Sequence, residues 1–174
     1  TRVRLTTPAN QWFYLGSIRK NAVFSDFSAG NEGIIINIYR EKKWWGIKSG
    51  LASRPLWQLE GMVTNLLLDG ASERLINYTG ELNTEDVSRS YPEKGYNLVA
   101  NPYPAFISWE NAAAWERPNV DGTIWYRGKI GDEMAFITYN KDAVPNAKVA
   151  LYPDKAVDFT SEEELSLIPP MQAV

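Results

Sequence analysis

The sequence predicts an all-β protein, an antiparallel β-sandwich or jelly-roll-like domain with one or two short helices. Three observations predict it. Roughly a dozen short segments with strand character are separated by turn signals. Aromatic residues make up 13 % of the sequence, and such side chains favour half-buried pleated surfaces. One strand ends in a corner built around two prolines, a feature that helical and disordered chains do not need.

This corner follows the strand-like stretch Tyr96–Ala100. Neither Pro102 nor Pro104 can donate to a strand ladder, so the strand must stop there. Asn101 and Tyr103 each precede a proline and are therefore driven to extended geometry. The amide of Asn101 can also hydrogen-bond the nearby backbone. We expect Asn101, Pro102, Tyr103 and Pro104 to form a rigid structural corner.

Strand signals of the first half come in the order Thr1–Leu5, Trp12–Gly16, Ile34–Arg40, Trp44–Ile47, Leu56–Leu68 and Arg74–Gly80. The fifth of these reads as two segments around Glu60 and Gly61. Alternation makes the first an edge strand, and β-branched residues make the third the clearest of all. The charged tip Glu41–Lys43 turns the chain into the fourth strand. Asp69 and Gly70 form a strong hairpin signal, which predicts that the sixth strand returns against the fifth. Asn21–Phe27 is either a short helical turn or an irregular strand.

The second half adds strand signals at Val87–Arg89, Thr123–Arg127, Met134–Tyr139 and Lys148–Tyr152, and a last strand after Leu167–Met171. Gly128–Asp132 is expected to be the tip of a hairpin in which Met134–Tyr139 returns against Thr123–Arg127. Ile107–Trp115 is the best helix candidate, with Ser108 as its N-cap. A second helix is expected to start at Ser161, since Glu164 stands at the capping-box position.

Three stretches recur in the same order along the chain. Trp12–Ile18 can be laid on Tyr96–Pro102, and Ile38–Arg40 matches Trp125–Arg127 at nearly the same offset. Leu56–Met62 resembles Ser166–Met171, with a longer insertion before it. We therefore expect one domain, 1–174, built from two related halves of about 1–80 and 81–174. The second half breaks off at Val174 where the first continues, which favours a domain excised from a longer polypeptide.

Composition excludes several classes of function. The net charge of −3 argues against a nucleic-acid partner, which would require a basic field. The sequence has no cysteine, and hence no disulfide, thiolate zinc site or cysteine nucleophile. It has no histidine, which excludes serine triads and the usual metalloprotease motifs. The longest apolar run, Leu66–Leu68, is too short for a transmembrane segment. These bounds leave open a cytosolic protein or a processed part of something larger.

Four stretches resemble one family of β-rich modules. These modules occur in secreted and cell-surface proteins of Bacteroidetes, often ahead of a type IX secretion sorting domain. The similar stretches follow the order of the modules along the chain: Tyr78–Val87, Gly95–Pro104 with Ile107–Trp109, Asp121–Tyr126 and Ile168–Ala173. Ala100 and Ala173 stand where glycine is common in those modules. The resemblance implies export and display at the cell surface. It carries no catalytic residues to this chain.

The aromatic side chains supply the candidate binding site. Trp44 and Trp45 are adjacent in a predicted strand, so they face opposite ways and one of them points outward unless a second layer covers it. Together with nearby Tyr39 they could serve as a platform for sugar stacking or a protein contact. Most other aromatic residues are expected to line the core. Arg40, Lys42, Lys43 and Lys48 cluster around this hairpin and are expected to form a solvated edge that guards against aggregation.

Carboxylates supply the alternative chemistry. Two facing carboxylates suffice for glycoside hydrolysis, and Glu60 and Glu110, each beside apolar residues, are the better candidates. Asn119, Asp121 and Asp142 could donate oxygen ligands to calcium, although no spacing matches an EF-hand. For most of the acidic residues we expect solvated or helix-capping roles.

The sequence therefore predicts a non-catalytic structural or adhesive module of an exported bacterial surface protein, without a cofactor. Its expected partners are other domains of the same polypeptide or other surface proteins. A carbohydrate-binding module that uses Trp44, Trp45 and Tyr39 is the first alternative. A glycosidase-like enzyme is the third.

Overall fold

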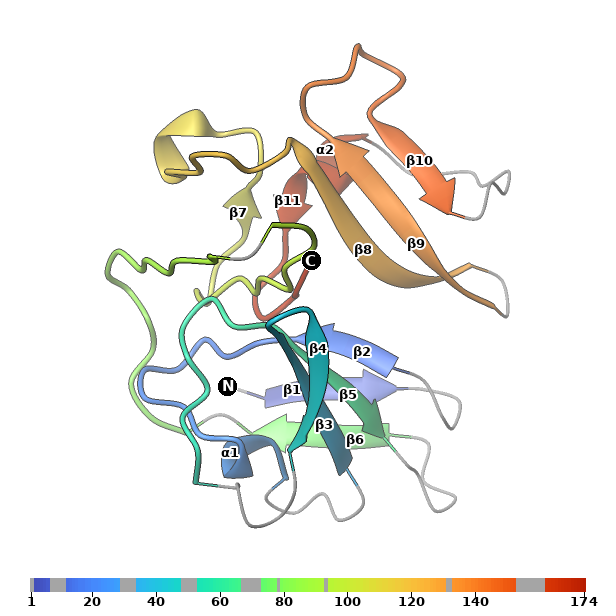
Figure 1. Ribbon diagram of the computed structural model, residues 1–174. Helices are drawn as coiled ribbons and strands as arrows, with labels where there is room; N and C mark the ends of the chain where they lie inside the picture. Colours follow the sequence, from blue (N-terminus) through green and yellow to red (C-terminus); the bar gives the residue numbers. More distant parts are fainter. Residues whose placement is uncertain are drawn as a thin grey trace. The chain divides into compact units, whose positions relative to one another are not determined.

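The computed structural model describes residues 2–6, 12–28, 34–47, 53–66, 73–77, 79–92, 94–130, 133–152 and 162–174 (Figure 1). These residues form several antiparallel sheets and two short helices, which confirms the all-β class. The finer prediction of a sandwich stays a prediction. The chain divides into two compact units, one of residues 1–104 and 171–173 and the other of residues 105–170 and 174. The division follows Pro104, whereas the halves expected from the sequence divide near residue 80.

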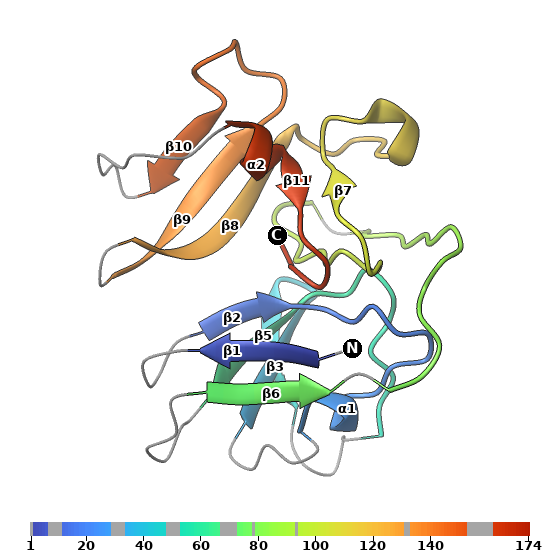
Figure 2. The same cartoon turned by 180° about the vertical axis from the view of Figure 1, so that it is seen from behind.

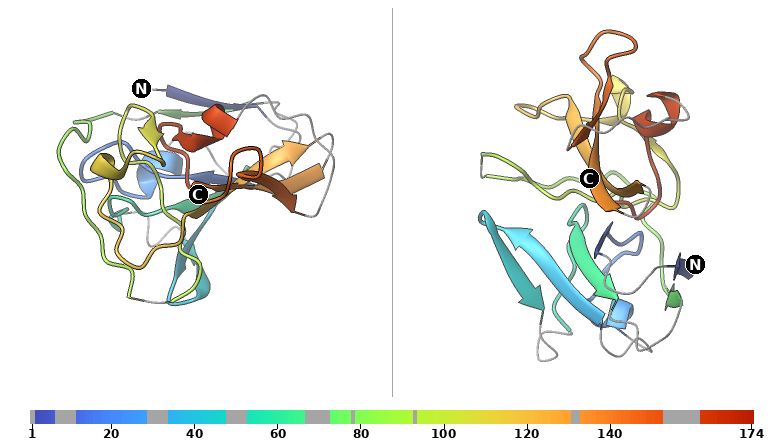
Figure 3. Two further views of the ribbon diagram at one scale, coloured as in Figure 1. Left: turned by 90° about the horizontal axis from the view of Figure 1, so that it is seen from above. Right: turned by 90° about the vertical axis from the view of Figure 1, so that its right-hand side faces the viewer.

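Unit 1 contains a four-stranded antiparallel sheet with the strand order β2-β5-β3-β4. Its members are β2 (Trp12–Leu15), β3 (Ile34–Arg40), β4 (Lys43–Ile47) and β5 (Met62–Leu66). The charged turn expected at the end of β3 is present, and Glu41 and Lys42 adopt positive φ there. Both views in Figure 3 show β3 and β4 running side by side.

A separate two-stranded sheet pairs β1 (Arg2–Thr6) with β6 (Glu73–Asn77), as Figure 2 shows. The predicted hairpin, in which this strand returns against β5, is therefore wrong. Asp69 and Gly70 themselves lie outside the described residues. A local turn signal cannot reveal that both edges of β5 are occupied, one by β2 and the other by β3, so that β6 pairs with β1 instead.

The main core of unit 1 lies on one face of the four-stranded sheet. It gathers the short helix α1 (Ser25–Ser28) and apolar residues from several strands. The buried members are Leu15, Ile18, Ala22, Phe24, Phe27, Ile36, Ile38, Leu56, Met62, Ile76 and Met171. A smaller cluster, Val63, Leu98, Ala100 and Ala173, has Trp12, Tyr14 and Tyr39 packed against it. Helix α1 resolves the ambiguity left by the sequence at Asn21–Phe27.

The proline-containing corner is the last part of unit 1 before the division. Asn101 is buried, and its side-chain oxygen accepts from the Tyr103 N–H at 2.9 Å. The Pro102 carbonyl accepts from the side chain of buried Asn83 at 2.9 Å. The hydroxyl of Ser17 makes the same local bond, accepting from the N–H of Arg19 at 3.1 Å. In each bend a side-chain oxygen thus replaces a ladder partner.

The backbone hydrogen bonds around Gly16 can also be matched with those around Ala100. The Gly16 N–H donates to Met171 and the Ala173 N–H to Tyr14, whereas the Ala100 N–H donates to Leu59 and the Gly61 N–H to Leu98. Gly16 thus corresponds to Ala100, Tyr14 to Leu98, Leu59 to Met171 and Gly61 to Ala173. Leu59 and Met171 both adopt positive φ, at 60° and 67°. The ancestry of the two halves stays a prediction.

Unit 2 contains the three-stranded sheet β10-β9-β8 and the small pair β11-β7. Its strands are β7 (Ile107–Ser108), β8 (Thr123–Ile130), β9 (Glu133–Asn140), β10 (Val149–Tyr152) and β11 (Leu167–Ile168). The long hairpin β8-β9 is the predicted one. Trp109, Ile124, Tyr126, Tyr139 and Ile168 form the buried core.

Three further predicted elements differ. The strand expected over Tyr96–Ala100 is reduced to two isolated bridges, Val99 with Glu60 and Ala100 with Ala173. The helix expected over Ile107–Trp115 is reduced to a 3₁₀ turn at Ala112–Ala114, whose N-cap is Asn111 and not Ser108. The preceding residues pair with β11 instead, and the backbone of Trp109 donates to Ser166. The strand expected at Val87–Arg89 is irregular chain.

Helix α2 (Glu162–Ser166) confirms the second predicted helix, although Ser161 lies outside the described residues. Within the described ranges, neither helix is long and apolar enough to span a membrane.

Candidate functional site

The hairpin β3-β4 places the predicted binding residues on two different faces. Tyr39 stands opposite Trp44, and Ile38 stands opposite Trp45. Directly opposed residues share a face and successive residues alternate, so Trp44 and Trp45 point to opposite sides of the sheet. Both are about half exposed, at 52 % and 48 %, because β4 is the last strand of this sheet.

Tyr39 and Trp44 form one of the two aromatic groups. Their ring centroids are 5.0 Å apart, with a 57° angle between the planes. Tyr39 in turn packs against the small cluster that contains Val63, Leu98 and Ala100. The structure thus brings together two of the three predicted residues and places the third, Trp45, elsewhere.

On the other face, Trp45 belongs to a group that we call the arginine–aromatic cluster: Arg40, Trp45, Trp57, Glu60, Arg89 and Tyr91. The Arg40 guanidinium lies 3.7 Å from the ring centre of Trp57, which is 50 % exposed. The Arg89 guanidinium lies 4.7 Å from the same ring and 5.2 Å from the ring of Tyr91. The Trp45 indole N–H donates to the Arg40 carbonyl at 3.2 Å. Trp57 therefore contacts two guanidinium groups, and Arg89 contacts two aromatic rings.

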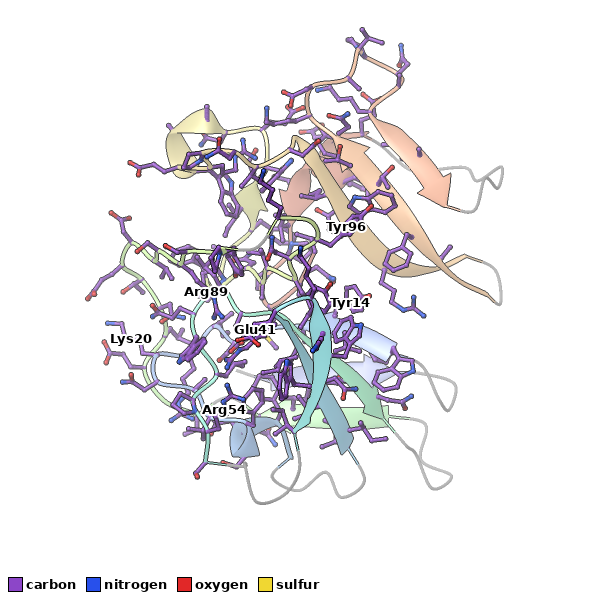
Figure 4. All side chains as sticks on the ribbon, in the orientation of Figure 1. Tyr14, Lys20, Glu41, Arg54, Arg89 and Tyr96 are labelled. Atoms are coloured by element: carbon purple, nitrogen blue, oxygen red, sulfur yellow. The ribbon has the colours of Figure 1, made fainter. Side chains whose placement is uncertain are left out.

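The buried carboxylate of Glu60 contacts three other members of the cluster. It is only 3 % exposed, and its Oε1 lies 2.5 Å from Nε of Arg40 and 3.5 Å from Nη2 of Arg89. Its Oε2 accepts from the Trp57 backbone N–H at 3.1 Å. Figure 4 labels Arg89 and also Glu41, the residue that follows Arg40 at the turn of the hairpin. The expectation that Arg40 is a solvated edge residue is wrong, since it is paired with a buried carboxylate; Lys48 lies outside the described residues.

Tyr91 is the remaining member of the cluster, and its hydroxyl is hydrogen-bonded to the backbone. Its hydroxyl donates to the Leu59 carbonyl at 2.7 Å. Burial raises the pKa of Tyr91, and the nearby Arg89 only partly opposes this. The phenol therefore remains a neutral hydrogen-bond donor throughout the physiological pH range.

Glu110, the other carboxylate candidate, lies in unit 2. It accepts hydrogen bonds from Lys148 and from the hydroxyl of Tyr139. The bond from Lys148 is the main reason that the pKa of Glu110 is lowered, and Tyr139 contributes next. Burial, and then the bond to Glu110, raise the pKa of Tyr139 to about 12. Glu110 is thus an ionised partner of two neighbouring side chains.

This geometry predicts a pH-dependent stability. Because the pKa of Glu110 is lowered in the folded protein, its contribution is present above the ordinary carboxyl range and lost as the pH falls. We expect Glu110→Gln to destabilise unit 2 modestly at pH 7, with the difference vanishing as the pH drops well below 4.5. Urea unfolding of both proteins at a series of pH values measures this. An equal difference at every pH would contradict the assignment.

The three calcium candidates lie near one turn of unit 2. Asp121 Oδ1 accepts from both the N–H and the hydroxyl of Thr123 at 3.0 Å, so it stabilises the turn itself. Asp142 is paired with Lys141 and lies against Gly122. Asn119 adopts positive φ, as turn asparagines do. Across the ranges that the structure describes, no three acidic side chains gather in a way that could hold a metal ion.

Sequence reasoning singled out Trp45 and Glu60 but missed their companions. Trp57 precedes Glu60 by three residues and shares its turn, which is a local signal that could have been found. Arg89 lies in irregular chain 29 residues beyond Glu60, and no sequence pattern connects the two. Only the fold brings them together.

Comparisons of the chain with protein-family models, with curated proteins and with solved structures found no match. The resemblance of Gly95–Pro104 and its companion stretches to the Bacteroidetes modules therefore stays a prediction. Any function proposed for this chain must rest on the contacts of its own residues around the hairpin β3-β4.

Proposed function

We propose that this chain is a non-catalytic structural or adhesive module of an exported bacterial surface protein, and that it attaches to its partners through the hairpin β3-β4. One observation supports this above the others. Trp44, Trp45 and Trp57 are each about half exposed, although tryptophan is usually largely buried. Large aromatic side chains at a surface are typical of contact sites.

These side chains are also held in place before any partner arrives. Trp44 lies against Tyr39, Trp45 donates to the Arg40 carbonyl, and Trp57 is stacked with two arginines. A side chain that is already ordered loses little conformational entropy on binding. Exposed and pre-ordered tryptophans therefore favour adhesion over a merely structural role.

A carbohydrate-binding module is the second candidate, favoured by the pair Tyr39 and Trp44. The Trp44 ring is supported by Tyr39 on the sheet and leaves half of its surface to solvent. The apolar C–H face of a sugar ring can pack on such a surface. Exported modules of this kind would bind glycans without altering them.

The test is the loss of adhesion on truncation. We expect Trp44→Ala or Trp45→Ala to weaken binding of the immobilised protein to its polysaccharide or extracellular-protein targets by roughly thirtyfold, the effect of a central contact residue. Phe106→Ala is the matched control, since Phe106 is an exposed aromatic residue of unit 2. Binding is measured by biolayer interferometry on panels of both target classes.

Three results would overturn the proposal. Unchanged binding of both tryptophan variants would exclude the hairpin as the attachment site. Release of reducing sugar from a bound polysaccharide would show a glycosidase instead. Protection of the parent polypeptide from protease added to intact cells would contradict display at the surface.

A further inference from the structure

We propose that the arginine–aromatic cluster binds the carboxylate of a uronic acid residue in an acidic polysaccharide. This rests on the proposed adhesive function and names its ligand. It concerns the face that carries Trp45, whereas the carbohydrate alternative above concerns the opposite face with Trp44. The two can therefore be tested separately.

The cluster has more positive charge than its own residues neutralise. Arg40 and Arg89 share the single carboxylate of Glu60, which leaves an excess of one positive charge. At the adjoining turn the exposed Lys42 and Lys43, the latter directly opposite Arg40, outnumber the exposed Glu41, so the field stays positive. Nearby anionic groups are attracted to such a surface.

Hydrogen-bond donors also exceed acceptors. Each guanidinium has five N–H donors. Nη2 of Arg40 lies 2.5 Å from Glu60 Oε1 as an ion pair, but it is buried and makes no hydrogen bond, whereas Nε donates to that oxygen. Nη1 of Arg89 is likewise buried without a partner. Unpartnered buried donors are costly, so an added acceptor here would be strongly favoured.

A carboxylate is the acceptor that fits best. Its two oxygens match the planar fork of a guanidinium, and the charged bonds are among the strongest in proteins. The arginine side chains retain 14 % and 16 % exposure, so they lie at the surface and are not sealed in the core. A ligand carboxylate can approach there and replace the shared Glu60 oxygen for one of the two arginines.

The neighbouring tryptophans indicate that the carboxylate belongs to a sugar. The Arg40 guanidinium lies over the half-exposed ring of Trp57, and the half-exposed Trp45 is held beside the backbone carbonyl of the same arginine, so charged and apolar groups lie close together. A uronic acid has this combination in one residue, an apolar C–H face and a carboxylate at its edge. The overall charge of −3 favours recognition of such a single group over a general attraction to polyanions.

The experiment compares polygalacturonate with fully methyl-esterified pectin, which has the same backbone with its carboxylates blocked. We expect the intact protein to bind polygalacturonate at least about tenfold more tightly than the ester, and to lose affinity as salt is added. Arg89→Gln is expected to weaken binding to polygalacturonate about tenfold to a hundredfold. Trp57→Ala should weaken it as well.

The variants are chosen so that folding does not obscure the answer. Arg89→Gln leaves the close pair of Arg40 and Glu60 in place, and thermal unfolding checks this. Arg89→Lys keeps the positive charge but loses the planar fork of the guanidinium. Its affinity for polygalacturonate is expected to fall between those of the intact protein and Arg89→Gln. Arg117→Gln is the matched control, since Arg117 lies 4.0 Å above the ring of Trp109, also has an unpartnered nitrogen, but covers a ring that is only 6 % exposed.

Equal binding to polygalacturonate and its ester would overturn the inference, as would full binding by Arg89→Gln. Binding of poly-glutamate in preference to polygalacturonate would reassign the cluster to acidic peptides and overturn it too. If the protein binds no polysaccharide but still adheres to protein targets through Trp44, this inference fails and the proposed function stands. If no target of any class is bound, the proposed function fails with it.

Discussion

Gly16→Ala is expected to destabilise unit 1 by about 1–3 kcal/mol, the usual effect of forcing an extra methyl group into a packed site. An added Cβ at residue 16 would lie far inside contact distance of the Cβ of Ala100. The backbone cannot move away easily, because the Gly16 N–H donates to the Met171 carbonyl at 2.8 Å. Three sequence-distant segments meet at this point. Urea unfolding followed by circular dichroism measures the change.

The clash has a specific remedy. Because the obstructing atom is the methyl group of Ala100, the double variant Gly16→Ala with Ala100→Gly should recover most of the lost stability. Gly46→Ala is the control, since its Cβ would meet only the side-chain oxygen of Asn37, at 3.3 Å. Additive losses in the double variant would show that the two residues do not touch.

Glu60→Ala is expected to cost about 3–5 kcal/mol, the largest effect among these predictions, because it leaves buried charges without their partner. Arg40 and Arg89 would then face each other with no carboxylate between them. The Trp57 backbone N–H would lose its acceptor as well. The free energy of unfolding in urea, followed by tryptophan fluorescence, measures the loss.

A surface ion pair supplies the comparison. Glu81 pairs with Lys20 at 2.8 Å but is largely exposed, so Glu81→Gln should change stability little. A loss of similar size for Glu60→Ala and Glu81→Gln would contradict the buried character of the cluster. The loss of stability in Glu60→Gln is expected to lie between the losses in Glu60→Ala and Glu81→Gln. The amide keeps the shape of the side chain, and its oxygen can still accept a hydrogen bond.

Much of the fold could be predicted because its signals are local. The sequence predicts Ile34–Arg40 as a strand from its β-branched residues and Thr123–Arg127 from the turn signal before it, and each begins a hairpin as expected. The failures share one cause. Ile107–Trp115 has helical signals, yet its first residues pair with β11, near the end of the chain. Tertiary pairing overrides a local preference for helix.

The candidate site was only half predictable. Alternation in a strand requires Trp44 and Trp45 to point in opposite directions, and the structure agrees. It does not indicate that both remain exposed, since that depends on β4 lying at the sheet edge. The position of Arg89 beside Glu60 follows from the path of an irregular segment with no periodicity of its own.

Residue type and spacing were enough to specify the all-β class, the principal strands and the exclusion of histidine and cysteine chemistry, because each of these is a local property. The pairing of β6 with β1 and the sharing of one buried carboxylate by two arginines became known only from the folded chain. Such contacts depend on which faces bury the most apolar surface when distant segments meet. That free energy belongs to the packed whole, and no window of the sequence contains it.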